Sequence, residues 1–159
     1  MARDAPSKHH DEGFTLTELM VVVLVIAVLI AIVVPTYTSA RARADNRVAQ
    51  TSLRHALIAA KAMYSDTSSY AGADASSTGL VTVEPNLTYV PHDTSSTGPK
   101  TVSVNASGQT WSAAVSSSGG NCYWLKEVGT AGISYGGALG GPASCSGDDA
   151  LGAASSAFP

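Results

Sequence analysis

Charged side chains are scarce in this chain, and neither sign dominates. Only 13% of the 159 residues are Asp, Glu, Lys or Arg, and the formal net charge is −3. Proteins that hold nucleic acid by its phosphates carry a clear basic excess. Nucleic-acid binding is therefore possible but unsupported by this composition. The length suits one domain plus a membrane anchor.

Cysteine and histidine are also too few for several common kinds of site. There are two cysteines and four scattered histidines, whereas a structural zinc site needs four clustered ligands. No Gly-x-Ser-x-Gly stands around any serine, and the glycine-rich tract 129–147 lacks a following Gly-Lys-Ser/Thr. We therefore expect no enzyme, no metal and no cofactor. Four other polar side chains are interpreted as isolated or simply solvated: His55, His92, Asp148 and Asp149.

What the chain does have is a long uncharged run, from Leu19 to Val34. Phe14 to Val34 is 21 residues, which as a helix would span about 31 Å at ~1.5 Å per residue. The hydrocarbon core of a bilayer is about 30 Å thick. Glu18 stands at the entrance of this run, and a bare charge inside a bilayer costs roughly 2.5–3.5 kcal/mol. The sequence thus predicts one membrane-spanning helix with a functional carboxylate.

The residues around Glu18 form a motif. Gly13-Phe14-Thr15-Leu16-Thr17-Glu18 precedes the apolar run, and Pro35 is the twenty-second residue counted from Phe14. This pattern resembles the processing site of the type IV pilin and pseudopilin family, in its class III form. The resemblance covers the first third of the chain. It implies a leader of residues 1–13, cleavage between Gly13 and Phe14 by a prepilin peptidase, and N-methylation of Phe14.

The same resemblance assigns Glu18 and Pro35 to assembly. Cleavage would create an α-amino group on Phe14 that is largely protonated near neutrality, and in the family Glu18 pairs with a neighbouring subunit. Buried charges are tolerated when they are paired. One buried ion pair between otherwise featureless apolar helices would fix their axial register.

Two other interpretations of the N-terminal region stay open. In the first, the segment is an ordinary single-span anchor, and Glu18 only marks the membrane interface. In the second, it is a secretory signal peptide with a small-x-small cleavage site at Ala40-Arg41-Ala42. Residues 1–13 carry Arg3 and Lys8 against Asp4, Asp11 and Glu12, and this net charge of −1 disfavours the second interpretation.

Membrane orientation and the cysteines are linked. Arg3 and Lys8 precede the span, but four arginines follow it, so charge counting alone would put the C-terminal part in the cytoplasm. We place the leader there instead, because the processing motif and the two cysteines both indicate an exported head. Cys122 and Cys145 are expected to form a disulfide, which the chain-entropy estimate values at about 3 kcal/mol.

The rest of the chain predicts an α+β fold. We expect a helix from about Phe14 to Tyr64, kinked or locally broken at Pro35. Its apolar residues from Ala49 to Tyr64 recur at spacings of three and four and so form one stripe to be buried. The expected parts are a membrane or filament-core helix over 14–40 and a head over 41–159, with its helix over 41–64, a loop over 65–79 and a sheet region over 80–159. Strands are expected at 80–84, 87–90, 101–104, 110–116, 122–128 and 133–135, with a hairpin connection at 116–120. The resemblance implies the pilin fold, in which the second half of the helix packs on a small antiparallel sheet.

We expect a structural subunit that is stored in the membrane by a single span and then polymerised into an extracellular filament for adhesion, motility or DNA uptake. The implied partners are copies of itself, a prepilin peptidase, an assembly ATPase and a platform membrane protein. The alternatives are a pseudopilin of a competence or secretion apparatus and an anchored binding domain that never polymerises. The filament's task, any ligand of the head and any glycosylation stay open.

Overall fold

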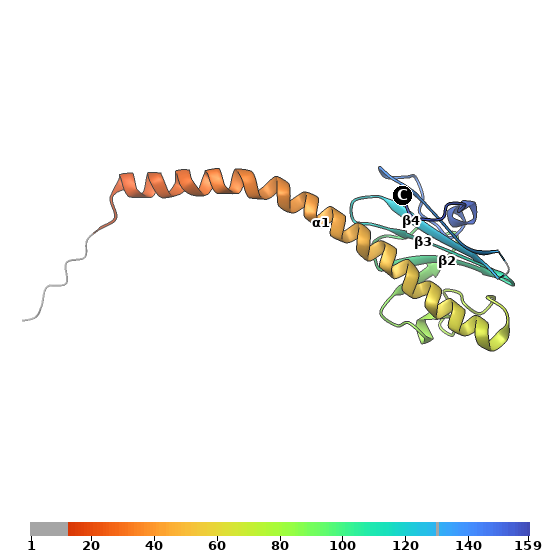
Figure 1. Ribbon diagram of the computed structural model, residues 1–159. Helices are drawn as coiled ribbons and strands as arrows, with labels where there is room; N and C mark the ends of the chain where they lie inside the picture. Colours follow the sequence, from red (N-terminus) through yellow and green to blue (C-terminus); the bar gives the residue numbers. More distant parts are fainter. Residues whose placement is uncertain (1–12, 130) are drawn as a thin grey trace, which may run out of the picture. The chain divides into compact units, whose positions relative to one another are not determined.

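The structure is a computed structural model that describes residues 13–129 and 131–159. All of the expected leader except Gly13 therefore lies outside the described residues. The chain divides into two compact units, one ending at Ser39 and one comprising Ala40–Pro159, and each is described by itself. The elements are α1 (Leu16–Thr67), η1 (Leu80–Thr82), β1 (Thr88–Pro91), β2 (Thr101–Ser107), β3 (Thr110–Ser116), β4 (Cys122–Val128), β5 (Gly132–Ala138) and η2 (Asp149–Gly152) (Figure 1).

Helix α1 has 52 residues, and its ends lie within three residues of the predicted ones. It runs through Pro35 without interruption, so the local break that the sequence allowed does not occur. Nearby hydroxyls bond back to the helix: Thr36 Oγ1 donates to the carbonyl of Val33 at 2.8 Å, and Ser39 Oγ donates to that of Pro35 at 3.0 Å. Hydroxyls that bond within the helix need no outside partner, which suits apolar surroundings.

The first unit contains the apolar half of α1. Every residue from Gly13 to Ser39 is exposed. An 18-residue stretch of α1 has a mean hydropathy of 3.2, long and apolar enough to cross a membrane. The large exposed side chains include Leu24 at 64% and Ile26 at 48%. This unit has no core of its own among the described residues.

The second unit contains a five-stranded sheet in the order β1-β2-β3-β4-β5. Strands β2 to β5 are antiparallel, each paired with the next, but β1 pairs with β2 in parallel. The expectation of a wholly antiparallel sheet is therefore wrong at one edge. The return from β1 to β2 is held by Ser96, whose hydroxyl donates to the carbonyl of Thr101 and accepts from the N–H of Ser116. These bonds stabilise a short parallel connection that no pattern in the sequence indicates.

Most strand predictions are confirmed, and one is wrong. Strands β3 and β4 begin and end where predicted, while β2 and β5 are longer. The segment 80–84 is not a strand, because it forms the 3₁₀ turn η1 instead. There the N–H of Leu80 bonds to the carbonyl of Asp74 at 3.1 Å, and that of Val83 to the carbonyl of Leu80 at 3.0 Å. Because its N–H groups are bonded locally and the following Pro85 has no N–H, this segment has few free donors for pairing with a sheet edge.

The core of the second unit lies between α1 and one face of the sheet, here called the inner face. Five predicted stripe residues of α1 are buried, together with Ser52 and Ala59: Ala49, Leu53, Ala56, Leu57 and Ala60. They form one cluster with inner-face side chains of the strands, including Val102, Trp111, Val115, Tyr123 and Leu125. Figure 1 shows this part of α1 beside β2, β3 and β4. The predicted helix-on-sheet arrangement is confirmed.

Candidate processing and assembly site

The start of α1 is organised by a reciprocal pair of side chains. The backbone N–H and the hydroxyl of Thr15 donate to Glu18 Oε2 at 3.0 and 2.7 Å, and the N–H of Glu18 donates to Thr15 Oγ1 at 3.2 Å. This is a capping box, in which the residue before the helix and the third helical residue satisfy each other's free groups. A carboxylate near a helix N-terminus is further favoured by the helix dipole.

Sequence reasoning missed this local role of Glu18. The signal was present, because Thr15-Leu16-Thr17-Glu18 followed by an apolar run has the spacing of a capping box. Both Thr15 bonds end on Oε2, whereas an ionised carboxylate can accept about four hydrogen bonds over its two oxygens. Helix capping therefore leaves accepting capacity on Glu18, above all at Oε1.

The structure brings three of the predicted site residues together and leaves one apart. Gly13 and Phe14 directly precede the capped turn, and Phe14 is 76% exposed. A Cβ added at Gly13 would meet no described residue within 4 Å. Pro35 lies seventeen residues beyond Glu18 in the same helix, about 26 Å along its axis. The cleavage point and Glu18 thus share one exposed helix end, and Pro35 belongs to a different part of α1.

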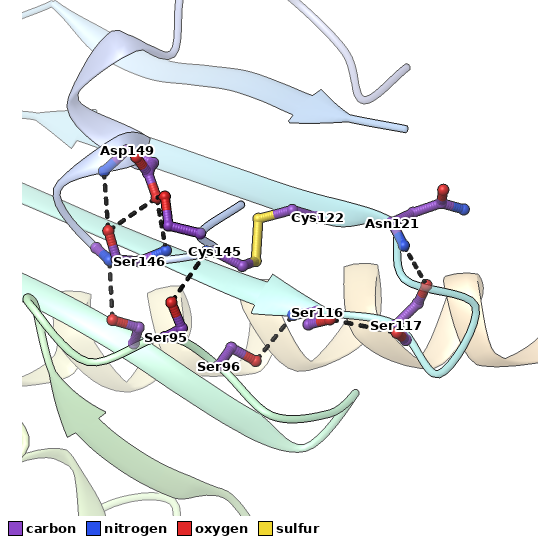
Figure 2. The surroundings of a disulfide bond; sticks show 12 residues. Ser95, Ser96, Ser116, Ser117, Asn121, Cys122, Cys145, Ser146 and Asp149 are labelled. Atoms are coloured by element: carbon purple, nitrogen blue, oxygen red, sulfur yellow. Dashed lines mark hydrogen bonds between the residues drawn. A yellow bond between two sulfur atoms is a disulfide. The ribbon is translucent and has the colours of Figure 1, made fainter. Parts of the chain in front are cut away.

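The predicted disulfide is confirmed. Cys122 at the start of β4 is bonded to Cys145, with their Cα atoms 5.6 Å apart (Figure 2). The bond holds the C-terminal segment against the outer face, which is the sheet face away from the α1 core, where Ala114, Ala150 and Trp124 pack around it. The Cys145 N–H donates to Ser95 Oγ at 3.3 Å. The C-terminal segment is therefore a second cover of the sheet, opposite α1.

A charged cluster that the sequence did not predict fixes the same segment to the β1–β2 edge. His92 Nδ1 lies 2.9 Å from Asp148 Oδ2, and the Asn105 amide donates to Asp148 Oδ1 at 2.7 Å. The hydrogen bond and the charge of Asp148 raise the pKa of His92, and the bond from His92 lowers that of Asp148. His92 is therefore not isolated, and Asp148 is not simply solvated.

Asp149 also has a structural role. It accepts bonds from the hydroxyls of Ser144 and Ser146, at 2.9 and 2.8 Å, and from the N–H of Ser146 at 2.9 Å. Partial burial raises the pKa of its carboxyl, but these bonds outweigh it and the net shift is downward. Within residues 13–129 and 131–159, no group of three or more His, Cys, Asp or Glu side chains could hold a metal ion.

Comparisons with known proteins agree with this geometry. A family model described as the prokaryotic N-terminal methylation motif matches residues 8–34, which includes the capped turn. The chain is similar to the type IV wide pilus major component PilA4 of Thermus thermophilus, with 31% identity over 110 residues, 68% of this chain and 84% of the relative. This chain belongs to the type IV pilin family. No solved structure matches the chain.

Membership accounts for the fold of this pilin. Its long N-terminal helix, apolar in the first half and buried on one face in the second, carries a small and mostly antiparallel sheet. The match to the relative extends well beyond the methylation motif, because 110 aligned residues must include much of the head. Both halves of the chain therefore belong to the same family.

Proposed function

We propose that this pilin is a structural subunit that is cut after Gly13, methylated on Phe14 and polymerised into an extracellular filament. The observation that carries the proposal is the apolar half of α1, every residue of which is exposed in the single subunit. Exposed apolar surface of this extent marks a membrane or protein contact. Before assembly the membrane would cover it, and in the filament the same half-helix of other copies would do so.

The processing step is supported by the position of Gly13, just before the start of α1. Gly13 lies outside α1, and no described residue would meet a Cβ added there within 4 Å, so the described fold does not require glycine at this position. If glycine is required at position 13, the requirement would come from the peptidase that cleaves the bond. Replacing Gly13 by a bulky residue should leave the fold unchanged and the precursor uncut.

The capping box suggests how Glu18 could serve in assembly. Thr15 holds the carboxylate through Oε2, and Oε1 can accept a further bond. Cleavage would turn the amide nitrogen of Phe14 into an ammonium group, and in the filament this group on one subunit would meet Glu18 of a neighbour. Thr15 would then orient the acceptor in advance, which reduces the ordering cost of binding.

The decisive experiment combines N-terminal mass spectrometry of surface material with electron microscopy. A mature chain that begins with N-methyl-Phe14 in abundant long fibres supports the proposal. A chain that begins at Arg43, the product of a signal peptidase acting after Ala42, refutes it.

Substitution of Glu18 tests its assembly role separately from processing. Glu18→Ala should still be inserted and cleaved, since the change makes the segment more apolar. It should impair polymerisation, because an uncompensated buried charge costs about 3–5 kcal/mol per subunit. Glu18→Gln should be milder. Thr17→Ala is the matched control, since among the described residues the Thr17 hydroxyl makes one long hydrogen bond, to that of Thr15 at 3.4 Å, and none to Glu18. Filaments of normal yield from Glu18→Ala would remove the pairing role.

The filament's machinery is proposed from family membership alone, which leaves the filament's task open. Copies of the same subunit, a prepilin peptidase, an assembly ATPase and a platform membrane protein are the proposed partners, and the role is structural rather than enzymatic. Adhesion, motility and DNA uptake are all compatible with such a filament. A pseudopilin would appear only in trace amounts or short fibres, and an anchored binding domain in no fibre at all.

A further inference from the structure

We propose that a groove at the β5 edge of the head binds a neutral, hydroxyl-rich ligand of the carbohydrate class, with the indole ring of Trp124 as its platform. The groove has a volume of about 540 Å³. It lies between the last two strands and the chain's final residues, and we call it the Trp124 groove. Its lining includes Trp124, Gly136, Gly137, Ser155, Ser156 and Phe158.

The indole ring is held in place from two sides. Trp124 is paired across the sheet with Gly136, and any Cβ at position 136 would overlap the indole. The ring therefore lies over a strand position that only glycine leaves free. Towards the middle of the sheet, Trp124 packs against the cluster of Ala114, Cys122 and Ala150. A ring fixed in this way loses little further freedom when a ligand stacks on it.

The opposite wall is the C-terminal segment, which is itself anchored. Ser155 exchanges two backbone hydrogen bonds with Tyr135, at 2.8 and 3.0 Å, and so extends the sheet at the β5 edge. Beyond it, the Phe158 ring packs against Tyr135 with 4.8 Å between centroids, and Arg54 lies over the same ring. The groove is thus bounded by ordered elements on both sides.

The chemistry of the lining selects the ligand class. Within the described residues, none of the lining side chains is Asp, Glu, Lys, Arg or His. The Arg54 guanidinium lies over the Phe158 ring and not in the lining, so the groove itself offers a phosphate or carboxylate no direct counter-charge. Trp124 is half-buried, and Ser155 and Ser156 are exposed. Their side chains offer an aromatic face beside an indole N–H and two hydroxyls. A sugar ring matches this set, because one face presents C–H groups to the indole while its rim presents hydroxyls.

The lining of the Trp124 groove includes no residue of α1, so it shares no residue with the apolar half-helix that the proposed polymer would bury. Only its display on a filament rests on the proposed function. Binding itself can be measured on the detergent-solubilised full chain. Failure to form filaments and failure to bind a ligand are therefore distinguishable.

The test is retention of the solubilised chain on immobilised neutral oligosaccharides, such as chitotriose, maltotriose and lactose-terminated glycans, beside sialylated and sulfated counterparts. We expect retention on at least one neutral glycan and a fall in affinity of tenfold or more in Trp124→Ala. Trp124→Phe should keep part of the binding. Gly136→Val keeps the tryptophan but displaces its ring, and should lose binding as well. Ser118→Ala, an exposed serine in the β3–β4 turn, is the matched control.

Tryptophan fluorescence gives a second readout that a purely structural role would not move. Of the two tryptophans, Trp111 is fully buried, so a ligand-induced spectral change should come from Trp124 and be absent in Trp124→Phe. The proposal is overturned if no neutral glycan is retained, if charged glycans are preferred, or if Trp124→Ala binds as well as the wild type. Should Trp124→Ala fail to fold, the double variant Ser155→Ala/Ser156→Ala replaces it, and unchanged binding there overturns the hydroxyl contacts.

Discussion

The two halves of α1 are one continuous helix with opposite relations to the rest of the molecule. Leu24 in the first unit is 64% exposed, whereas Leu53 in the second is fully buried. The first unit has no buried side chain among its described residues, and the second contributes seven α1 residues to the interior. The capping box supports the start of the first half, while tertiary packing supports the second.

The single subunit therefore buries the apolar face of the second half of α1 but leaves the first half exposed. In the second unit, α1 packs on the inner face of the sheet, and a disulfide holds the C-terminal segment on the outer face. The first unit presents an exposed and mostly apolar surface over a length that can cross a membrane. Its covering must come from lipid or from other chains. Each prediction below changes one half and asks whether the other half is affected.

The largest expected effect comes from removing the first half. A fragment that starts at Arg41 should be soluble, monomeric and folded, because the second unit contains the whole core. Circular dichroism should show both helix and sheet signals, with a cooperative thermal transition. Aggregation of this fragment, or loss of its sheet signal, would contradict the independence of the two units.

Matched leucine substitutions should sharpen the comparison within the full chain. Leu53→Ala should destabilise the head by about 2–5 kcal/mol, the range for large-to-small changes in a packed core. Leu24→Ala should leave head stability unchanged, because its side chain contacts no core, and it should weaken filament contacts. Denaturant unfolding monitored by head fluorescence compares the two. Equal destabilisation by both changes would show that the halves are coupled.

The sequence predicted the elements with regular patterns and failed where pairing depends on single side chains. Strand β3 was predicted because Trp111, Ala113 and Val115 alternate onto one face, and β4 because Tyr123, Trp124 and Val128 favour strands. The parallel pairing of β1 depends on the Ser96 hydroxyl bridging Thr101 and Ser116, and no periodicity encodes such a bond. The alternating residues 80–84 resembled a strand, yet backbone bonds to Asp74 and within the turn replaced the sheet ladder.

The candidate site shows the same division. The motif identified Gly13, Phe14 and Glu18 because their spacing is local in sequence. The partners of Asp148 could not be predicted, since His92 and Asn105 are more than forty residues away and meet it only after the C-terminal segment folds onto the sheet. The capping role of Glu18 was predictable, because Thr15 and Glu18 have the capping-box spacing directly before an apolar run.

The disulfide should matter for the second half alone. Cys122→Ser with Cys145→Ser should lower the stability of the head by roughly 2–5 kcal/mol, as loss of a native disulfide in a small exported domain usually does. The helical signal of the first half in detergent should persist. Chemical unfolding with and without reductant measures the first effect, and alkylation of unreduced protein checks the bond. Two freely alkylated thiols in the native protein would contradict it.

The smallest expected effect is the pH dependence of the His92–Asp148 contact in the second half. Folding raises the pKa of His92 above its ordinary value of about 6.5. The stability that His92 contributes is therefore fully present below about pH 6.5 and is lost as the pH rises through its pKa in the folded protein. Folding lowers the pKa of Asp148 below its ordinary value of about 3.9. The stability that Asp148 contributes is fully present above about pH 3.9 and is lost as the pH falls through its pKa in the folded protein.

The contact should therefore stabilise the head most between about pH 4 and pH 6.5. The gain should be slight, because both side chains are about half exposed and solvent screens exposed pairs. His92→Asn keeps a donor near the Nδ1 position but cannot be charged, so the variant should unfold more easily than the wild type at pH 5 and equally easily at pH 9. Asp93→Asn removes the other carboxylate that raises the pKa of His92 and should change the profile less. A stability difference between wild type and His92→Asn that does not vary with pH would show that the contact acts through its geometry and not through charge.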